Sequence, residues 1–187
     1  MEEEIELYLE DANEHMDKAI QHLNYELSHI RAGKANPAML DSIKVDYYGT
    51  LTPLNQMSSV TTPDARTLMI KPWEKTVLHD IERAIINSDL GLNPQNDGEQ
   101  VIINIPILTE ERRVALVKQV RHEGELGKVS IRNIRKDVND SLKKLQKDGA
   151  SEDEVKRAED RVQKMTDDHV KKVDELLHKK EEEIMTV

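Results

Sequence analysis

The sequence contains no cysteine and no phenylalanine, and only 3% of its 187 residues are aromatic. Without cysteine the chain can form neither a disulfide nor a cysteine-ligated zinc site, and it has no thiol nucleophile. A compact core relies on large aromatic side chains, so we expect aliphatic residues to be buried along extended helical seams instead. No apolar run approaches the roughly 20 residues of a membrane span, and the acidic N-terminus lacks the apolar segment of a secretory signal. We therefore expect a cytoplasmic protein that does not enter a membrane.

Positive charge is scarce in the chain as a whole but is concentrated in residues 112–147. The net charge of the protein is −10, whereas this segment holds eleven lysines and arginines against four acids. The segment therefore carries +7 and the remainder of the chain −17. Charge separated in this way indicates an anionic partner for one face, and nucleic acid is the leading candidate.

Three segments have the apolar spacing of amphipathic helices. The first covers residues 3–30, the second covers 109–147, and the third begins at Ser151. Thr109 is expected to cap the second helix, and Ser151–Glu154 predicts a capping box for the third. Isolated charged helices of this length are unstable in water, so we expect all three to pack as a bundle. The apolar residues expected along the seams are Leu9, Ala12, Met16, Ile20, Leu23, Leu27, Ile30, Val114, Val117, Val120, Ile131, Ile134, Val138, Leu142, Leu145, Val155, Ala158, Val162, Met165, Val173, Leu177 and Ile184.

The sequence between the first two predicted helices lacks their continuous helical spacing of apolar residues. Short alternating or β-branched segments predict strands, and Pro53, Pro63 and Pro72 separate them. Residues 76–87 have helical spacing. The expected strands are 43–47, 60–62, 67–70 and 101–105. Together these elements predict a small β/α/β lobe.

The expected fold class is α+β, with an elongated three-helix bundle and an inserted α/β lobe. We expect the bundle to comprise residues 1–30 and 106–187, and the lobe to comprise residues 31–105. The chain passes between the two parts near 31–37 and again near 105–108. Two crossings with a small interface permit the lobe to rotate against the bundle. A rigid, well-packed junction is the alternative.

Four basic residues of the second helix are predicted to form a row, which we call the basic row: Arg121, Lys128, Arg132 and Arg135. At 100° per residue they fall within a sector of roughly 60°, beside the apolar seam. Such a row suits the phosphates of folded RNA, because each guanidinium can bind two oxygens. The alternative is a solvated face with local ion pairs, but acids of the same helix are too few to neutralise the row. Two arginines at the start of the helix either extend this surface or form structural pairs: Arg112 and Arg113.

Two glycines, Gly124 and Gly127, lie inside the same helix and each costs ~1 kcal/mol relative to alanine. They either allow the close approach of a partner backbone or are tolerated on an exposed face.

No motif in the sequence predicts an active site, a metal site or a bound cofactor. His15, His22 and His29 recur every seven residues, but this spacing separates them by roughly 10.5 Å along a helix. One metal ion with ligand bonds near 2 Å cannot bind all three. Gly-rich phosphate loops, serine-centred elbows and HExxH motifs are absent from the sequence. We therefore do not expect an enzyme, and a metal-dependent hydrolase lacks a ligand set.

Five segments, in order and at family-like spacing, resemble the bacterial ribosome recycling factor family from end to end. They are Ile30–Pro37, Asp46–Leu54, Ser88–Pro94, Leu108–Arg113 and Val129–Asp137. The resemblance implies a monomeric, L-shaped protein that disassembles the post-termination ribosome together with elongation factor G and its GTP hydrolysis. A helical RNA-binding or chaperone-like module without ribosome-splitting activity is the alternative.

The resemblance also implies roles for individual residues. Large-subunit ribosomal RNA is bound in the family chiefly by bundle arginines, which correspond here to Arg132 and Arg135, with Arg31 near the first hinge. The expected hinges consist of Arg31, Ala32 and Gly33 in the first crossing and Ile105, Pro106 and Ile107 in the second. Lysine replaces the family's common arginine at three positions, where a bidentate phosphate contact is not available: Lys34, Lys128 and Lys136.

Overall fold

A computed structural model describes residues 1–186, and the chain packs as two compact units. Unit 1 comprises Met1–Ala32 together with the chain from Glu110 onward, and unit 2 comprises Gly33–Thr109. The sequence placed these divisions a few residues earlier, after residues 30 and 105. Within residues 1–186, no helix is long and apolar enough to cross a membrane.

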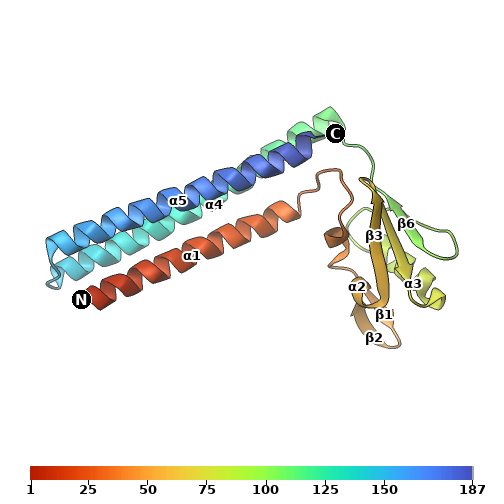
Figure 1. Ribbon diagram of the computed structural model, residues 1–187, viewed down its shortest axis with the longest axis horizontal. Coiled ribbons are helices and arrows are strands. Elements are labelled where there is room, and N and C mark those ends of the chain that lie inside the picture. Colours follow the sequence, from red (N-terminus) through yellow and green to blue (C-terminus); the bar gives the residue numbers. More distant parts are fainter. Residues whose placement is uncertain (187) are drawn as a thin grey trace. The chain divides into compact units, whose positions relative to one another are not determined.

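Unit 1 consists of three long helices that lie side by side (Figure 1). They are α1 (Glu2–Ser28), α4 (Glu110–Lys147) and α5 (Glu152–Met185). Each contributes a stripe of buried aliphatic residues, as expected for a chain so poor in aromatic residues. The fold class predicted from the sequence, α+β with a helical bundle, is confirmed.

The predicted seams are largely correct, with one clear error on α4. All the seam positions predicted on α1 are buried except Ile20, which is half-buried. On α4, Val114 is 48% exposed, and Leu116 is buried instead. Eighteen residues, or five helical turns, separate Val114 from Arg132, so the two share the outward face of the helix.

The turn between α4 and α5 is fixed by its backbone. Gly149 has a φ of +110°, and its N–H donates to Gln146 while that of Ala150 donates to Leu145. This pair of bonds is a Schellman motif, which glycine favours. The capping box predicted at Ser151 is wrong. Among residues 1–186 the Ser151 side chain makes no capping hydrogen bond, and its carbonyl closes the first turn of α5 instead, accepting from Val155 at 3.0 Å.

The two glycines inside α4 face neighbouring helices of the bundle. A Cβ atom on Gly124 would lie 2.3 Å from Leu177 Cδ1 and 2.9 Å from Leu177 Cγ, on α5. A Cβ atom on Gly127 would lie 3.4 Å from Leu23 Cδ2, on α1, which is ordinary van der Waals contact. Neither expectation is correct for Gly124, because it is buried and the group that approaches it is the side chain of Leu177 on α5, not a partner backbone.

Unit 2 is built from antiparallel strands with a nine-residue helix and a four-residue helix packed against them. A four-stranded sheet has the order β3-β4-β6-β5, and β1 and β2 form a separate hairpin. Helix α3 packs against β1, β5 and β6 over a core of aliphatic side chains. The elements are β1 (Lys44–Tyr47), β2 (Thr50–Pro53), α2 (Leu54–Met57), β3 (Ser58–Asp64), β4 (Thr67–Pro72), α3 (Leu78–Ile86), β5 (Pro94–Asn96) and β6 (Val101–Asn104), with short 3₁₀ turns at Pro37–Leu40 and Lys75–Val77.

Sequence reasoning missed β2 and β5 because proline stands in both. Pro53 is the last residue of β2, and Pro94 is the first residue of β5, which is an edge strand. Pro63 lies in the other edge strand, β3, where the pairing register shifts between Thr61 and Asp64. Proline is tolerated at such ends, edges and bulges because no ladder hydrogen bond is lost there.

Both segments that enter and leave unit 2 are anchored to it. The N–H of Ala35 donates to Ala65, and that of Ile105 donates to Arg66 at 2.7 Å. Gly33 has a φ of +73°, and an added Cβ would lie 2.7 Å from Leu108 Cγ. Only glycine fits at position 33 without strain, because both the backbone conformation and the neighbouring leucine exclude a side chain.

The two glycines of α4 predict opposite effects of the same substitution. Gly124→Ala should lower the free energy of unfolding by ~1–2 kcal/mol, because forcing Leu177 aside costs more than the gain in helix propensity. Gly127→Ala should raise it by up to ~1 kcal/mol, because the added methyl fits. Chemical denaturation of both variants and the wild type measures this difference. Equal stabilisation by the two substitutions would show that Leu177 moves without cost.

Candidate nucleic-acid interface

The structure places three members of the basic row against α5. Arg121 Nε lies 3.0 Å from Glu181 Oε1, and Lys128 Nζ lies 2.6 Å from Asp174 Oδ1. Lys128 is only 17% exposed and also lies 3.9 Å from Glu125. The third, Arg135, donates to Gln163 Oε1 at 3.4 Å.

These contacts correct the charge argument made from the sequence. The acids of α4 alone are too few to neutralise the row. The acids come from α5, because the row lies on the edge of α4 that faces this helix. A pattern read along one helix cannot show which residues a neighbouring helix brings to it.

Arg132 differs from the other members of the row. It is exposed, and among residues 1–186 it makes neither a hydrogen bond nor an ion pair. Lys136 follows it one turn later on the same face and is also exposed. Val129, one turn earlier, is 47% exposed. This face therefore combines unpaired cations with an accessible aliphatic side chain, a surface that suits phosphate oxygens and the sugar edge of RNA.

The remaining predicted RNA-binding residues do not join Arg132 in one cluster. Arg112 and Arg113 lie in the first turn of α4, roughly 30 Å along the helix from Arg132. Arg112 is exposed, while Arg113 is half-buried with its Nε lacking a hydrogen-bond partner within residues 1–186. Arg31 is half-buried and follows α1. The predicted cations are thus spread along unit 1, as an extended RNA surface would require.

The histidines form no metal site. Within residues 1–186, no group of three or more histidine, aspartate or glutamate side chains is placed to bind an ion. His15 and His29 each bond through Nδ1 to the carbonyl four residues earlier, at 2.6 Å and 2.8 Å. Their seven-residue spacing therefore reflects a shared position on the surface of α1.

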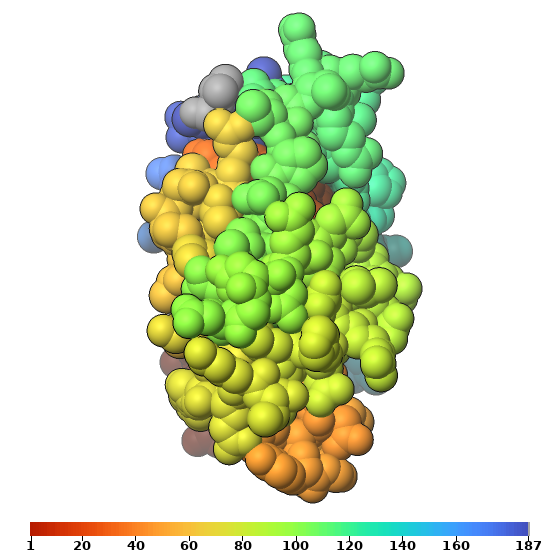
Figure 2. Space-filling view, turned by 90° about the vertical axis from the view of Figure 1, so that its right-hand side faces the viewer, coloured from red at the N-terminus to blue at the C-terminus, as the bar shows by residue number. Residues whose placement is uncertain are grey.

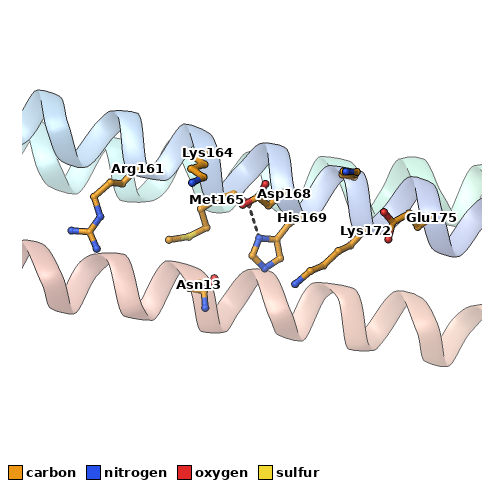
Figure 3. A pocket seen from close by; sticks show the side chains of 9 residues that line it. Asn13, Arg161, Lys164, Met165, Asp168, His169, Lys172 and Glu175 are labelled. Carbon is orange, nitrogen blue, oxygen red and sulfur yellow. Dashed lines mark hydrogen bonds between the residues drawn. The ribbon is translucent and has the colours of Figure 1, made fainter.

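A buried histidine on α5 was missed by sequence reasoning. His169 Nδ1 lies 2.6 Å from the carbonyl oxygen of Met165, and Nε2 lies 2.8 Å from Asp17 Oδ1 on α1. Figure 3 shows the ring reaching from α5 toward α1. Both partners are acceptors, so the two bonds form together when each ring nitrogen carries a proton. The signal in the sequence was a gap in the apolar pattern of α5, which the buried residues Thr166 and His169 fill.

His169 lies at the floor of an open groove of about 630 Å³ between α1 and α5 (Figure 3). Its charges are mixed, since lysines and an arginine alternate with acids. Arg161 is already held by both oxygens of Glu6. The groove therefore presents no uniform charge to a ligand. The charged residues that line it are Arg161, Lys164, Asp168, Lys171, Lys172 and Glu175.

Comparison with known proteins shows to which family this chain belongs. The family model described as ribosome recycling factor matches residues 23–185. The chain belongs to the ribosome recycling factor family. The resemblance seen in the sequence is confirmed.

Full-length relatives within the family are more than half identical to this chain. The ribosome-recycling factor of Cytophaga hutchinsonii is 58% identical over 185 residues, covering 99% of this chain and 100% of the relative. That of Amoebophilus asiaticus is 57% identical over 185 residues, with the same coverage.

Two structures of family members resemble the whole chain. A solution structure of a ribosome recycling factor is 35% identical, with a TM-score of 0.83 and 98% of each chain covered. The second is described as a model of the T. thermophilus ribosome recycling factor and the E. coli elongation factor G bound to the E. coli post-termination complex. It is 50% identical, with a TM-score of 0.65, and covers 97% of this chain and 99% of that chain.

The pair His169–Asp17 predicts a measurable coupling between α1 and α5. His169→Ala and Asp17→Ala should each destabilise the bundle, and a double-mutant cycle should give a coupling of ~1–2 kcal/mol. The control is His15→Ala, which should change the free energy of unfolding by less than ~0.5 kcal/mol because its ring is exposed. Additive effects of the two substitutions would show that the bond contributes nothing to stability.

Proposed function

We propose that this protein recycles ribosomes. It binds the post-termination ribosome and, with elongation factor G and GTP, promotes its dissociation so that the subunits can initiate again. The observation that carries this function is the full-length match to a family whose member has been placed with elongation factor G on the post-termination complex.

The protein contributes binding and force transmission and performs no catalytic step of its own. GTP is hydrolysed by elongation factor G, and no cofactor is needed on this chain. The site of action is the ribosome, and therefore the cytoplasm. The basic face of α4 suits large-subunit ribosomal RNA, because its exposed cations can exchange bound counterions for phosphates.

Arg132 is the principal RNA contact in this proposal, supported by its exposure and the lack of a partner within residues 1–186. Arg121, Lys128 and Arg135 also take part, although each has a partner on α5 to exchange for phosphate. Arg31, Arg112 and Arg113 extend the contact toward one end of unit 1, where α1 ends and α4 begins. The stiffness of the bundle matters here, because a helix that melted would absorb the push of the translocase.

Two short hinges connect the units in this proposal. The first consists of Arg31, Ala32 and Gly33, where the positive φ of Gly33 marks the change of direction. For the second, the sequence suggested Ile105, Pro106 and Ile107. Ile105 is buried in the core of unit 2 and bonded to Arg66, which favours a pivot from Pro106 onward, where the chain is exposed.

A splitting assay tests the function. Purified post-termination ribosomes should dissociate into subunits only when this protein, elongation factor G and GTP are all present. Light scattering follows the loss of intact ribosomes. Binding to ribosomes without any splitting would contradict the proposal and favour the alternative, an RNA-binding module with a different role.

The role of Arg132 can be tested by truncation. Arg132→Ala should remain folded, because alanine is the better helix former and the side chain is exposed. Loss of a charge-assisted contact should weaken ribosome binding by ~1.5–3 kcal/mol, roughly ten- to a hundredfold. Arg132→Lys should restore binding only in part, since an ammonium lacks the planar fork. Co-sedimentation with ribosomes and circular dichroism measure both properties.

Two further lysine variants provide the comparison. Lys128→Ala should weaken binding less than Arg132→Ala, because Lys128 must first leave Asp174. Lys179→Ala, at an exposed position of α5, should bind like the wild type. If Arg132→Ala is folded and binds as tightly as Lys179→Ala, Arg132 is a solvated surface charge.

A further inference from the structure

The β1–β2 hairpin of unit 2 has an unfavourable residue in its turn. Tyr47 pairs with Thr50, so the loop consists of Tyr48 and Gly49 alone. Their φ angles are +51° and +82°, the pattern of a type I′ turn, for which Asn-Gly is the preferred sequence. Tyr48 is the only non-glycine residue with a positive φ within residues 1–186. Tyrosine at this position therefore makes the turn less stable than asparagine would, and it places an aromatic side chain at the tip of the hairpin.

The tyrosine ring is held in a fixed position. Tyr48 Oη donates to Glu74 Oε2 at 2.6 Å, and Tyr47 Oη donates to Glu74 Oε1 at 2.9 Å. The two rings lie 4.6 Å apart in an edge-on arrangement. We call these three residues the aromatic corner. Strained backbone that places a side chain in one orientation is typical of ligand-binding positions.

The tyrosine at the tip of the aromatic corner is exposed, although only 3% of the residues of the chain are aromatic. Tyr48 is 78% exposed, and Trp73, which directly precedes Glu74, is 70% exposed. Leu51, in the second strand of the same hairpin, is 67% exposed. The hairpin lies at the edge of unit 2 (Figure 1; orange in Figure 2). Tyrosine and tryptophan are enriched among the residues that contribute most of the binding energy at protein interfaces.

The chemistry of the corner selects a cation. Hydrogen bonds from Tyr48 and Tyr47 hold the pKa of the Glu74 carboxyl below its ordinary value, so it is ionised at neutral pH. Each carboxylate oxygen keeps a lone pair for a further donor, and the faces of the tyrosine rings attract positive charge. Unit 2 holds nine acids against six lysines and arginines, a net charge of −3. Unit 2 has no basic segment like residues 112–147, so no cluster of cations offsets the repulsion between Glu74 and RNA phosphates.

We infer that the aromatic corner is the contact of unit 2 with elongation factor G and that it receives an arginine or lysine side chain of that protein. The inference rests on the proposed function, in which the exposed cations of unit 1 serve the RNA. Elongation factor G must then contact a surface other than these cations. The aromatic corner offers it a rigid surface that is both anionic and aromatic. Tyr47 and Glu74 position the ring of Tyr48.

The variant Tyr48→Asn distinguishes a role of the tyrosine ring in binding from a role in the stability of the fold. The substitution creates the preferred Asn-Gly turn, so the melting temperature should equal or exceed that of the wild type. Ribosome binding without elongation factor G should not change. In the splitting assay, the concentration of elongation factor G at half-maximal rate should rise roughly five- to tenfold. Glu74→Lys should raise it further, because it replaces the anion with a competing cation, and Glu74→Gln should have an intermediate effect.

The control is Tyr25→Ala, which removes an exposed tyrosine of α1 whose ring lies against His29 and should leave the half-saturating concentration unchanged. An unchanged half-saturating concentration for Tyr48→Asn and Glu74→Lys would overturn the inference. Weaker ribosome binding of Tyr48→Asn without elongation factor G would also overturn it, since the corner would then contact the ribosome. So would a lower melting temperature, since the ring would then serve the fold. Failure of the wild type to split ribosomes would contradict the proposed function instead.

Discussion

The close packing of α4 against α5 is the interaction on which unit 1 depends. Within residues 1–186, no other pair of elements makes as extensive a contact. Glycine at position 124 allows this packing without displacing Leu177, whose side chain lies where a Cβ atom would be. The same contact brings Asp174 to Lys128 and Glu181 to Arg121. Helix packing thus decides which cations of α4 are neutralised and which, such as Arg132, are left for a partner.

The partners proposed for the two units differ because their charges are distributed differently. Unit 1 is acidic as a whole, with 28 acids against 21 lysines and arginines, but it concentrates positive charge in residues 112–147 of α4; unit 2, at −3, has no comparable basic segment. Arginine and lysine on a stiff helix suit a polyanion, since the backbone already holds them in order. An acidic surface with exposed aromatic residues is unsuitable for a polyanion and suits a protein. A factor that must hold RNA while another protein moves it needs both kinds of surface.

The sequence predicted those features that depend on periodicity within one element. The seam of α1 and the small α/β lobe follow from local spacing, and the structure contains both. Val114 was placed on the seam wrongly, because apolar character alone does not fix which face of a helix is buried. His169 was missed for the opposite reason, since a polar residue can be buried when its bonds are satisfied across the interface. The partners of Lys128 and Arg121 depend on the register of two helices, which local patterns do not contain.

The hairpin of unit 2 shows how local rules and function compete. Tyr48-Gly49 occupies a turn for which Asn-Gly is preferred, and this is a second reason, besides Pro53, why local propensity does not predict β2. The fold tolerates the tyrosine because Glu74 bonds its hydroxyl and the aliphatic core of unit 2 fixes the surrounding strands. Positions that break a local rule and are stabilised by tertiary contacts are expected at functional sites, because selection there acts on the exposed group. The positive φ of Tyr48 therefore supports the inferred contact more specifically than the exposure of the hairpin does, since exposed apolar side chains are common on protein surfaces.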